Sequence, residues 1–385
     1  MATLMQASEQ WSKRPADQRF LSLDEMAETK QNIRDNSRAD VISNRHLKFV
    51  PHPSNPRKGL TIEGSNGYYD PTHYSFSQIA GLAKAPAGYL RTLDPALVAD
   101  NLNHSLGVNR DVEEVGILRT KALIEGDGMA GTIKGGPGVD IQESVELRAA
   151  TGPNYGRVWD VDIINMLRNR FGDGRTGNFR VPGEFGQDVP ITWDNTTLYA
   201  SDRDMFVFLA DENNRVEVAN RRDGNSGSLA RGFFVWNSEV GSSSLGAAFF
   251  LFDFACSNRI VWGAEGFKEI RLRHSSGAPD RWMEGVVPVL QEYANSAAAP
   301  IERTIAIAQE KRVDDNLAEF FKNRNFSAAE RRVAEEAHVR EEGRPIETLW
   351  DAVTGVTAAA KTIRNQDDRV QMERKGGALL DLADF

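Results

Sequence analysis

One stretch, residues 231–263, constrains the fold more than the rest of the chain, because it is the most apolar segment and holds the only cysteine. It reads RGFFVWNSEVGSSSLGAAFFLFDFACSNRIVWG. Its longest apolar run, residues 245–256, contains Asp253 and is shorter than the roughly 20 apolar residues that a membrane span needs. The stretch is therefore predicted to form part of a buried core.

Three elements and one polar turn are predicted within this stretch. Residues 232–236 read as a short buried strand, residues 245–257 as a helix buried nearly all round, and residues 259–262 as a second strand. The serines of the turn NSEVGSSS can cap that helix. Cys256 then lies at the buried C-terminal end of the helix. A reactive thiolate is favoured at a helix N-terminus or beside a cation, so Cys256 is predicted to be a small buried side chain.

The remaining pattern predicts an α+β fold: an antiparallel sheet with segregated helices and a helical C-terminal region. Strands are expected at residues 115–125 and 143–151, a helix at 160–171, and further strands joined by a turn at 211–214. The chain is expected to divide into four parts. They are a polar, partly extended N-terminal segment (residues 1–73), a short helical region of three helices (74–110), an α+β core domain (111–280) and a C-terminal helical region (281–385).

Two capping boxes and one apolar stripe are predicted in the helical regions. Ser75 with Gln78, and Ser327 with Glu330, have the spacing of capping boxes. The stripe runs from Leu349 to Val370 with 4,3 spacing, as one long helix. That spacing allows a coiled-coil seam and hence a homo-oligomer; the alternative is a helix that packs back onto the sheet.

Charge and composition limit the function. The formal net charge is −9, from 46 Lys+Arg against 55 Asp+Glu, which opposes nonspecific attraction to nucleic acid or anionic lipid but leaves a local basic face open. One cysteine excludes an intrachain disulfide and any multi-cysteine metal site, and the six histidines lack metal-ligand spacing. No metal and no cofactor are predicted. The Gly-rich loop 126–138 is expected to be a hairpin tip. The N-terminus has no apolar core of signal-peptide length, which favours the cytosol.

A row of arginines is the candidate binding site. In residues 267–274 side chains alternate, so that Arg271 and Arg273 share one face while His274 lies on the other. Arginines on one face can receive phosphates. The alternative is a solvated edge strand whose arginines pair with Glu269, Asp253 or Glu239. The predicted nucleic-acid-binding residues are Arg221, Arg222, Arg231, Arg259, Arg271, Arg273 and His274, with Trp236 and Trp262 for base stacking if they are exposed.

The central motif resembles the phage- and plasmid-encoded family called domain of unknown function 932. The resemblance rests on an Asn-Ser-Glu-Val-Gly turn, a Cys-Ser-Asn element and RLRHSSG, and extends weakly over residues 74–380. The family-motif residues are Asn237, Ser238, Glu239, Gly241, Cys256, Ser257 and Asn258. The sequence departs from the family in RAATGPNYGRVWD, where it leaves Arg148 and Arg157.

This resemblance implies a bacteriophage or mobile-element protein in the cytoplasm of a bacterial host, and no known reaction. Three functions are carried forward. The first is binding or annealing of single-stranded DNA in replication or recombination. The second is a structural or interaction protein that self-assembles through its C-terminal helices. The third is an enzyme acting on nucleotides or nucleic acid through His274 and Glu239; since no nucleophile or metal set accompanies them, no catalytic residue is assigned.

Overall fold

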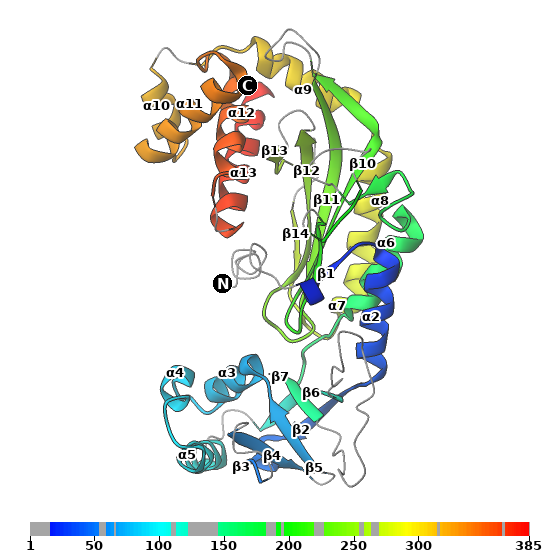
Figure 1. Ribbon diagram of the computed structural model, residues 1–385, viewed down its shortest axis with the longest axis vertical. Coiled ribbons are helices and arrows are strands. Elements are labelled where there is room, and N and C mark those ends of the chain that lie inside the picture. The colour runs from blue at the N-terminus through cyan, green and yellow to red at the C-terminus, as the bar shows by residue number, and fades with distance from the viewer. Residues whose placement is uncertain are drawn as a thin grey trace.

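The chain has two sheets, each covered by helices, and the predicted α+β class is confirmed. A small lobe lies at one end of a long central sheet, and the C-terminal helices lie at the other end, so that the molecule is curved (Figure 1). The computed structural model describes residues 16–53, 59–64, 67–108, 113–121, 145–181, 190–193, 196–218, 227–253, 258–262, 269–313, 316–363 and 366–384.

The small lobe contains a six-stranded sheet in the order β2-β6-β7-β5-β4-β3, in which only β5 and β7 are paired in parallel. Its strands are β2 (Ser37–Ser43), β3 (Lys48–Pro51), β4 (Leu60–Gly64), β5 (Gly67–Pro71), β6 (Glu114–Lys121) and β7 (Val145–Thr151).

Three short helices cover this sheet, as the sequence predicts: α3 (His73–Leu82), α4 (Ala87–Leu90) and α5 (Pro95–Val108). The predicted Ser75 capping box is wrong. Thr72 is the N-cap of α3, and its hydroxyl accepts from the Ser75 N–H at 3.2 Å, because the helix begins earlier than the apolar spacing suggests. Ser75 instead donates to the Leu147 carbonyl of β7 at 2.6 Å.

The central sheet has the order β1-β9-β10-β11-β12-β13, with β8 paired to β10 and β14 paired to β12. The strands are β1 (Arg19–Phe20), β8 (Phe179–Arg180), β9 (Leu198–Ala200), β10 (Met205–Val218), β11 (Gly227–Asn237), β12 (Leu245–Asp253), β13 (Asn258–Ile260) and β14 (Ile270–Leu272). The predicted single sheet is therefore two sheets. The turn expected at 211–214 is an irregularity within β10, where Asp211 accepts from the Asn214 N–H at 3.1 Å.

The helix predicted at 245–257 is wrong over the described part, because residues 245–253 form strand β12. Every residue of β12 is buried. Leu245, Ala247 and Phe249 face one core while Ala248 and Phe250 face another, so apolar residues occupy both faces and hide the two-residue period of the strand. Cys256 and the loop 126–138 lie outside the described residues.

Helices cover one face of the central sheet. The helices are α2 (Leu23–Asp35), α6 (Asp160–Phe171), α7 (Ala278–Arg281), the π-helical turn η5 (Trp282–Val286) and α8 (Val287–Asn295). In Figure 1, α2, α6 and α8 lie along the same outer side of the sheet. The predicted helix α6 is confirmed. The sequence did not predict α2, which falls within the segment expected to be polar and partly extended.

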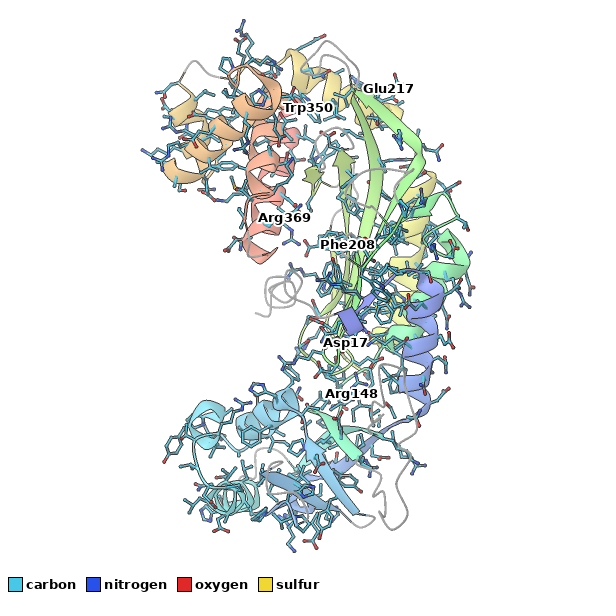
Figure 2. The ribbon with its side chains drawn as sticks, in the orientation of Figure 1. Asp17, Arg148, Phe208, Glu217, Trp350 and Arg369 are labelled. Atoms are coloured by element: carbon cyan, nitrogen blue, oxygen red, sulfur yellow. The ribbon has the colours of Figure 1, made fainter. Side chains whose placement is uncertain are left out.

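Aromatic rings cover the opposite face and are packed across glycines. A Cβ at Gly246 would lie 2.1 Å from the Trp236 ring, and a Cβ at Gly232 would lie 2.4 Å from the Phe250 ring. Each ring therefore packs over a glycine of the neighbouring strand, where no side chain blocks the contact. Phe208, labelled in Figure 2, belongs to the same buried aromatic cluster.

The C-terminal helices form the last core. They are α9 (Ala299–Glu310), α10 (Leu317–Lys322), α11 (Ala328–Glu342), α12 (Leu349–Ala360) and α13 (Gln366–Leu380), and the short 3₁₀ helix η6 (Asp381–Asp384) follows them. Two further 3₁₀ helices, η2 (Ala16–Gln18) and η3 (Asn44–His46), lie in the N-terminal part of the chain. The Ser327–Glu330 capping box is confirmed.

The long stripe from Leu349 to Val370 is not one helix, because α12 ends at Ala360 and α13 begins at Gln366. Every residue of α12 is buried, and its apolar side chains share a core with Leu251 and Ile260 of the sheet. The packing alternative is therefore confirmed for this part of the stripe. No helix among the described residues is long and apolar enough to cross a membrane.

The packing of Trp236 over Gly246 gives a testable expectation. Gly246→Ala should lower the free energy of unfolding by about 1–3 kcal/mol, because its methyl group must displace the indole ring or the strand. The control is Gly81→Ala in α3, where a Cβ meets nothing within 4 Å. This substitution should stabilise the helix by about 0.5–1 kcal/mol. Urea unfolding measures both changes. Equal stability of the two variants would contradict the packing account.

Candidate functional site

The Asn-Ser-Glu-Val-Gly turn lies between β11 and β12 and is buried rather than presented at the surface. Asn237 and Ser238 are 0% exposed and Glu239 is 2% exposed. Gly241 has φ +86°, a conformation that favours glycine, so the chain can reverse there. The turn is therefore a core element with polar side chains, which demand partners.

Glu239 joins the two sheets. Its Oε2 accepts from Nη2 of Arg148 at 3.1 Å, and Arg148 belongs to β7 of the small lobe. Its Oε1 accepts from the backbone N–H of Asp160 at 2.9 Å, at the start of α6. Arg157 donates to the Glu239 carbonyl. Figure 2 labels Arg148 near the point where the small lobe meets the central sheet.

A second buried carboxylate lies beside the first. The Asp160 carboxylate forms an ion pair with Nζ of Lys30 at 3.1 Å and accepts a hydrogen bond from Nδ2 of Asn237 at 2.7 Å. Lys30 also donates to the Ser201 carbonyl at 2.9 Å. Lys30 and Asp160 are each 2% exposed, so α2, α6 and the NSEVG turn are tied together inside the protein.

The two carboxylates have opposite pKa shifts. Burial, followed by the charge of Glu239, raises the pKa of Asp160 above its usual value. Burial alone would also raise the pKa of Glu239, but Arg148, Lys30 and the Asp160 N–H together hold it below its usual value. Glu239 is thus the more strongly stabilised anion of the two.

His274 anchors the chain at the end of β14. Its Nδ1 lies 3.0 Å from the Gly156 carbonyl oxygen, and its ring stacks on Tyr155 with centroids 4.8 Å apart. Tyr155 in turn donates to the Ser238 carbonyl at 2.7 Å. Burial lowers the pKa of His274 to about 4. The imidazole is therefore neutral near pH 7, and its Nδ1–H donates to the carbonyl.

This cluster has the features of a structural junction. The carboxylate oxygens of Glu239 contact Arg148 and Asp160, whereas His274 contacts Gly156, so the described contacts do not form the acid–base pair considered from the sequence. Within the described ranges, no group of three or more His, Cys, Asp or Glu could hold a metal ion. Nη1 of Arg148 has no protein partner among the described residues; such groups are commonly satisfied by buried water.

The predicted arginine row is partly assembled on β14. Arg271 and Arg273 are exposed, as the alternation predicts, while Ile270 and Leu272 pack toward the core. Two further arginines that the sequence analysis did not include join them. Arg281 of α7 donates to the hydroxyl of Ser275 at 2.6 Å, and Arg374 of α13 pairs with Glu269, which also pairs with Arg271.

Several predicted binding residues lie inside the protein instead. Arg231 is 4% exposed and donates to the Ser296 hydroxyl at 3.0 Å. Trp236 and Trp262 are 1% and 7% exposed, so neither indole ring can stack a base in this conformation, and His274 is buried as well. Arg221, Arg222, Cys256 and Ser257 lie outside the described residues, as do the side chains of Arg259 and Asn258.

The sequence analysis missed the partners of Glu239. The sequence marked Arg148 and Arg157 only as part of a departure from the family pattern. It did not mark Lys30 or Asp160. Lysine and aspartate on helices are mostly exposed, so no local signal marks these two as buried. The one indirect signal is Glu239 itself, because a carboxylate next to a buried apolar strand requires a cation.

The family comparison gives a match over much of the central sheet and the C-terminal helices. The model of a family described as Domain of unknown function (DUF932) matches residues 190–379. No curated protein matches the chain. No solved structure matches it either. The match includes the NSEVG turn, which lies in the middle of the junction described above.

The buried neutral His274 gives an expected pH dependence. The unfolded chain takes up a proton below about pH 6.5 and the folded one only near 4, so the contribution of His274 to stability is full above pH 6.5 and declines as the pH falls. The decline should reach about 3 kcal/mol at pH 4. His274→Gln should remove this pH-dependent loss of stability.

Urea unfolding of both proteins between pH 7 and pH 4 measures this contribution as a difference. Ser276→Ala, an exposed change in the following turn, is the control and should keep the wild-type profile. A stability difference between wild type and His274→Gln that does not vary with pH would contradict the neutral buried imidazole.

Proposed function

We propose, from the premise that residues 190–379 of this chain belong to the DUF932 family, that the protein binds single-stranded nucleic acid through its phosphates along the edge strand β14. The observation that carries the proposal is a group of four arginines at β14: Arg271 and Arg374 share the carboxylate of Glu269, and Arg281 donates to the carbonyl of Arg273. Guanidinium groups in excess over carboxylates attract phosphate, even on a chain whose net charge is −9.

The arrangement favours backbone contacts over base contacts. Arg271 lies in β14 and Arg273 directly follows the strand, and both side chains are exposed with two-residue spacing. The aromatic side chains considered for stacking are buried, so the proposed interface relies on charge. Contacts to phosphate position a strand without reading its sequence. Binding should therefore be weak, indifferent to sequence and sensitive to salt.

The proposal includes a setting in the cytoplasm of a bacterium that hosts a phage or plasmid. Single strands arise there during replication and recombination. The resemblance of the central motif to phage- and plasmid-encoded proteins supports this setting. Self-assembly through the C-terminal stripe has less support than binding, because α12 is buried within its own chain.

Removal of two arginines tests the interface. Arg271→Ala/Arg273→Ala should abolish binding of a fluorescently labelled single-stranded oligonucleotide at 20 mM salt without lowering the melting temperature. Wild-type affinity should fall with salt at a logarithmic slope of about −2 to −3, as expected for three or four phosphates on a single strand. Fluorescence anisotropy measures binding, and calorimetry of the same preparation measures melting.

A matched control removes one exposed and one half-buried arginine, both of them paired with glutamates. Arg312→Ala/Arg331→Ala changes the net charge equally, at residues that pair with Glu347 and Glu335, and should keep wild-type binding. A wild-type protein that fails to bind near 20 mM salt would end the proposal. So would an Arg271/Arg273 variant that melts earlier yet binds as the wild type does.

A further inference from the structure

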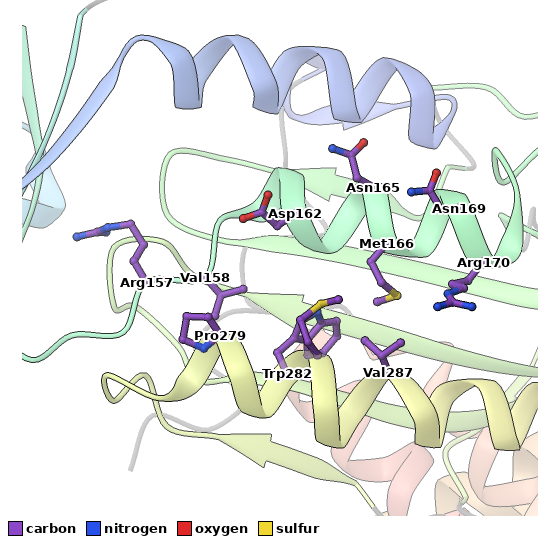
Figure 3. Close-up of a pocket in the computed structure, with 11 residues that line it drawn as sticks. Arg157, Val158, Asp162, Asn165, Met166, Asn169, Arg170, Pro279, Trp282 and Val287 are labelled. Atoms are coloured by element: carbon purple, nitrogen blue, oxygen red, sulfur yellow. The ribbon is translucent and has the colours of Figure 1, made fainter.

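A pocket of about 610 Å³ lies between helix α6 and the segment α7–η5–α8, and Arg271 and Arg273 are not among its lining residues. Figure 3 shows Met166 and Arg170 extending from α6 toward Trp282 and Val287 on the facing segment. The volume is within the range of about 300–1,000 Å³ that is typical of small-molecule sites. Nothing in the proposed strand-binding function uses this pocket.

A distorted helix forms one wall. In η5 the N–H of Val287 donates to the Trp282 carbonyl, five residues back. Pro288 follows, and because proline has no N–H and its ring crowds the preceding turn, the ordinary α-helical pattern cannot continue through it. Residues five apart lie about 140° apart around an α-helix, but a π-turn brings them close to the same side. Trp282 and Val287 therefore both line the pocket.

The floor of the pocket holds a buried hydrogen-bond donor without a partner. Trp282 is 1% exposed, and its Nε1 has no hydrogen-bond partner among the described residues. An indole N–H can only donate, and leaving it unpaired in a buried site is costly. Because this N–H is itself buried, it is closed off from the pocket, and the floor presents apolar surface to a ligand. Met166 and Val287 lie beside it as apolar wall, and Met283, which is 54% exposed, lines the pocket as well.

Cations and amides surround this apolar floor. Arg157 and Arg170 come from opposite ends of the α6 segment, and Asn165 and Asn169 are one helical turn apart on α6. Asp162, the carboxylate of the lining, is already paired with Arg34. Nε of Arg157 is buried and has no partner among the described residues. The pocket thus combines an apolar floor with amides and with positive charge that no lining carboxylate fully offsets.

We propose that this pocket binds a nucleoside phosphate. A nucleobase is flat and has apolar faces, which can pack on the apolar lining that Met166, Met283 and Val287 provide. The amides of Asn165 and Asn169 can each donate and accept, as base edges and ribose hydroxyls require. Arg170 supplies the charge for the phosphate. An inorganic anion would leave the apolar floor unused, and an uncharged apolar molecule would leave the amides and Arg170 unused.

Isothermal titration calorimetry of the full chain tests this proposal. The probes are AMP, CMP, GMP and UMP, with adenosine and inorganic phosphate as partial ligands. We expect at least one mononucleotide to bind at least about tenfold more tightly than adenosine or phosphate, since both halves of the pocket are then used. No binding of any nucleotide at millimolar concentration would overturn the proposal. So would phosphate binding as tightly as the nucleotides, because the pocket would then be an anion site.

Two variants locate the binding site. Arg170→Ala should weaken mononucleotide binding about tenfold and leave adenosine unaffected, because only the phosphate contact is lost. Met283→Ala removes an exposed apolar side chain of the lining, and should weaken nucleotide and adenosine binding alike. The control is Arg168→Ala, on the same helix but paired with Asp24 and outside the pocket lining. Equal loss in Arg168→Ala and Arg170→Ala would show a nonspecific charge effect and overturn the assignment.

A parallel titration separates this proposal from strand binding. Arg170→Ala should keep wild-type affinity for the labelled single strand, and Arg271→Ala/Arg273→Ala should keep wild-type affinity for the mononucleotide. If the pocket instead receives a nucleotide of the bound strand, Arg170→Ala weakens oligonucleotide binding and free mononucleotides do not bind, which overturns the proposal of a free ligand.

Discussion

The ion pair between Arg148 and Glu239 is the interaction on which the rest of the structure depends. It is 3.1 Å long, and its two residues are 6% and 2% exposed. A buried charge is tolerated only when it is paired and hydrogen-bonded. Arg148 comes from the sheet of the small lobe and Glu239 from the turn of the central sheet, so a buried charge of each sheet is paired with a charge of the other. The two lobes are thereby coupled.

Both candidate surfaces are connected to the same turn. The carboxylate of Glu239 accepts from the first N–H of α6, and α6 forms one wall of the pocket. The Ser238 carbonyl accepts from Tyr155, which stacks on His274 at the end of β14, and β14 carries the arginine row. A polar turn inside an apolar core can thus position both surfaces. This explains why short polar residues lie in the middle of the most apolar part of the chain.

The sequence was sufficient for the fold class and for much of the helical structure, but not for the partners of the buried charges. Periodicity correctly predicted α6 and the three helices of the small lobe, because each has one apolar and one polar face. It failed at β12, where both faces are buried and the two-residue period disappears. It also could not bring Lys30 to Asp160, 130 positions later in the chain, since such pairing depends on tertiary packing alone.

The arginine row shows the same division between local and tertiary information. Alternation correctly placed Arg271 and Arg273 on one face, but Arg281 and Arg374 joined them only through the packing of α7 and α13. The exposure of Trp236 could not be read from the sequence, because a tryptophan in a strand can lie on either face. Its burial follows from Gly246 on the adjacent strand, which leaves room for the ring.

A double-mutant cycle at the junction tests the central claim most directly. Urea unfolding of the wild type, Arg148→Met, Glu239→Gln and the double variant gives the coupling free energy between the two side chains. The account predicts that each single change costs about 3–5 kcal/mol, because it leaves a buried charge or polar group without its partner. It also predicts that the double variant costs clearly less than the sum. Additive costs, with a coupling near zero, would show that Arg148 and Glu239 stabilise the protein independently and would contradict the account.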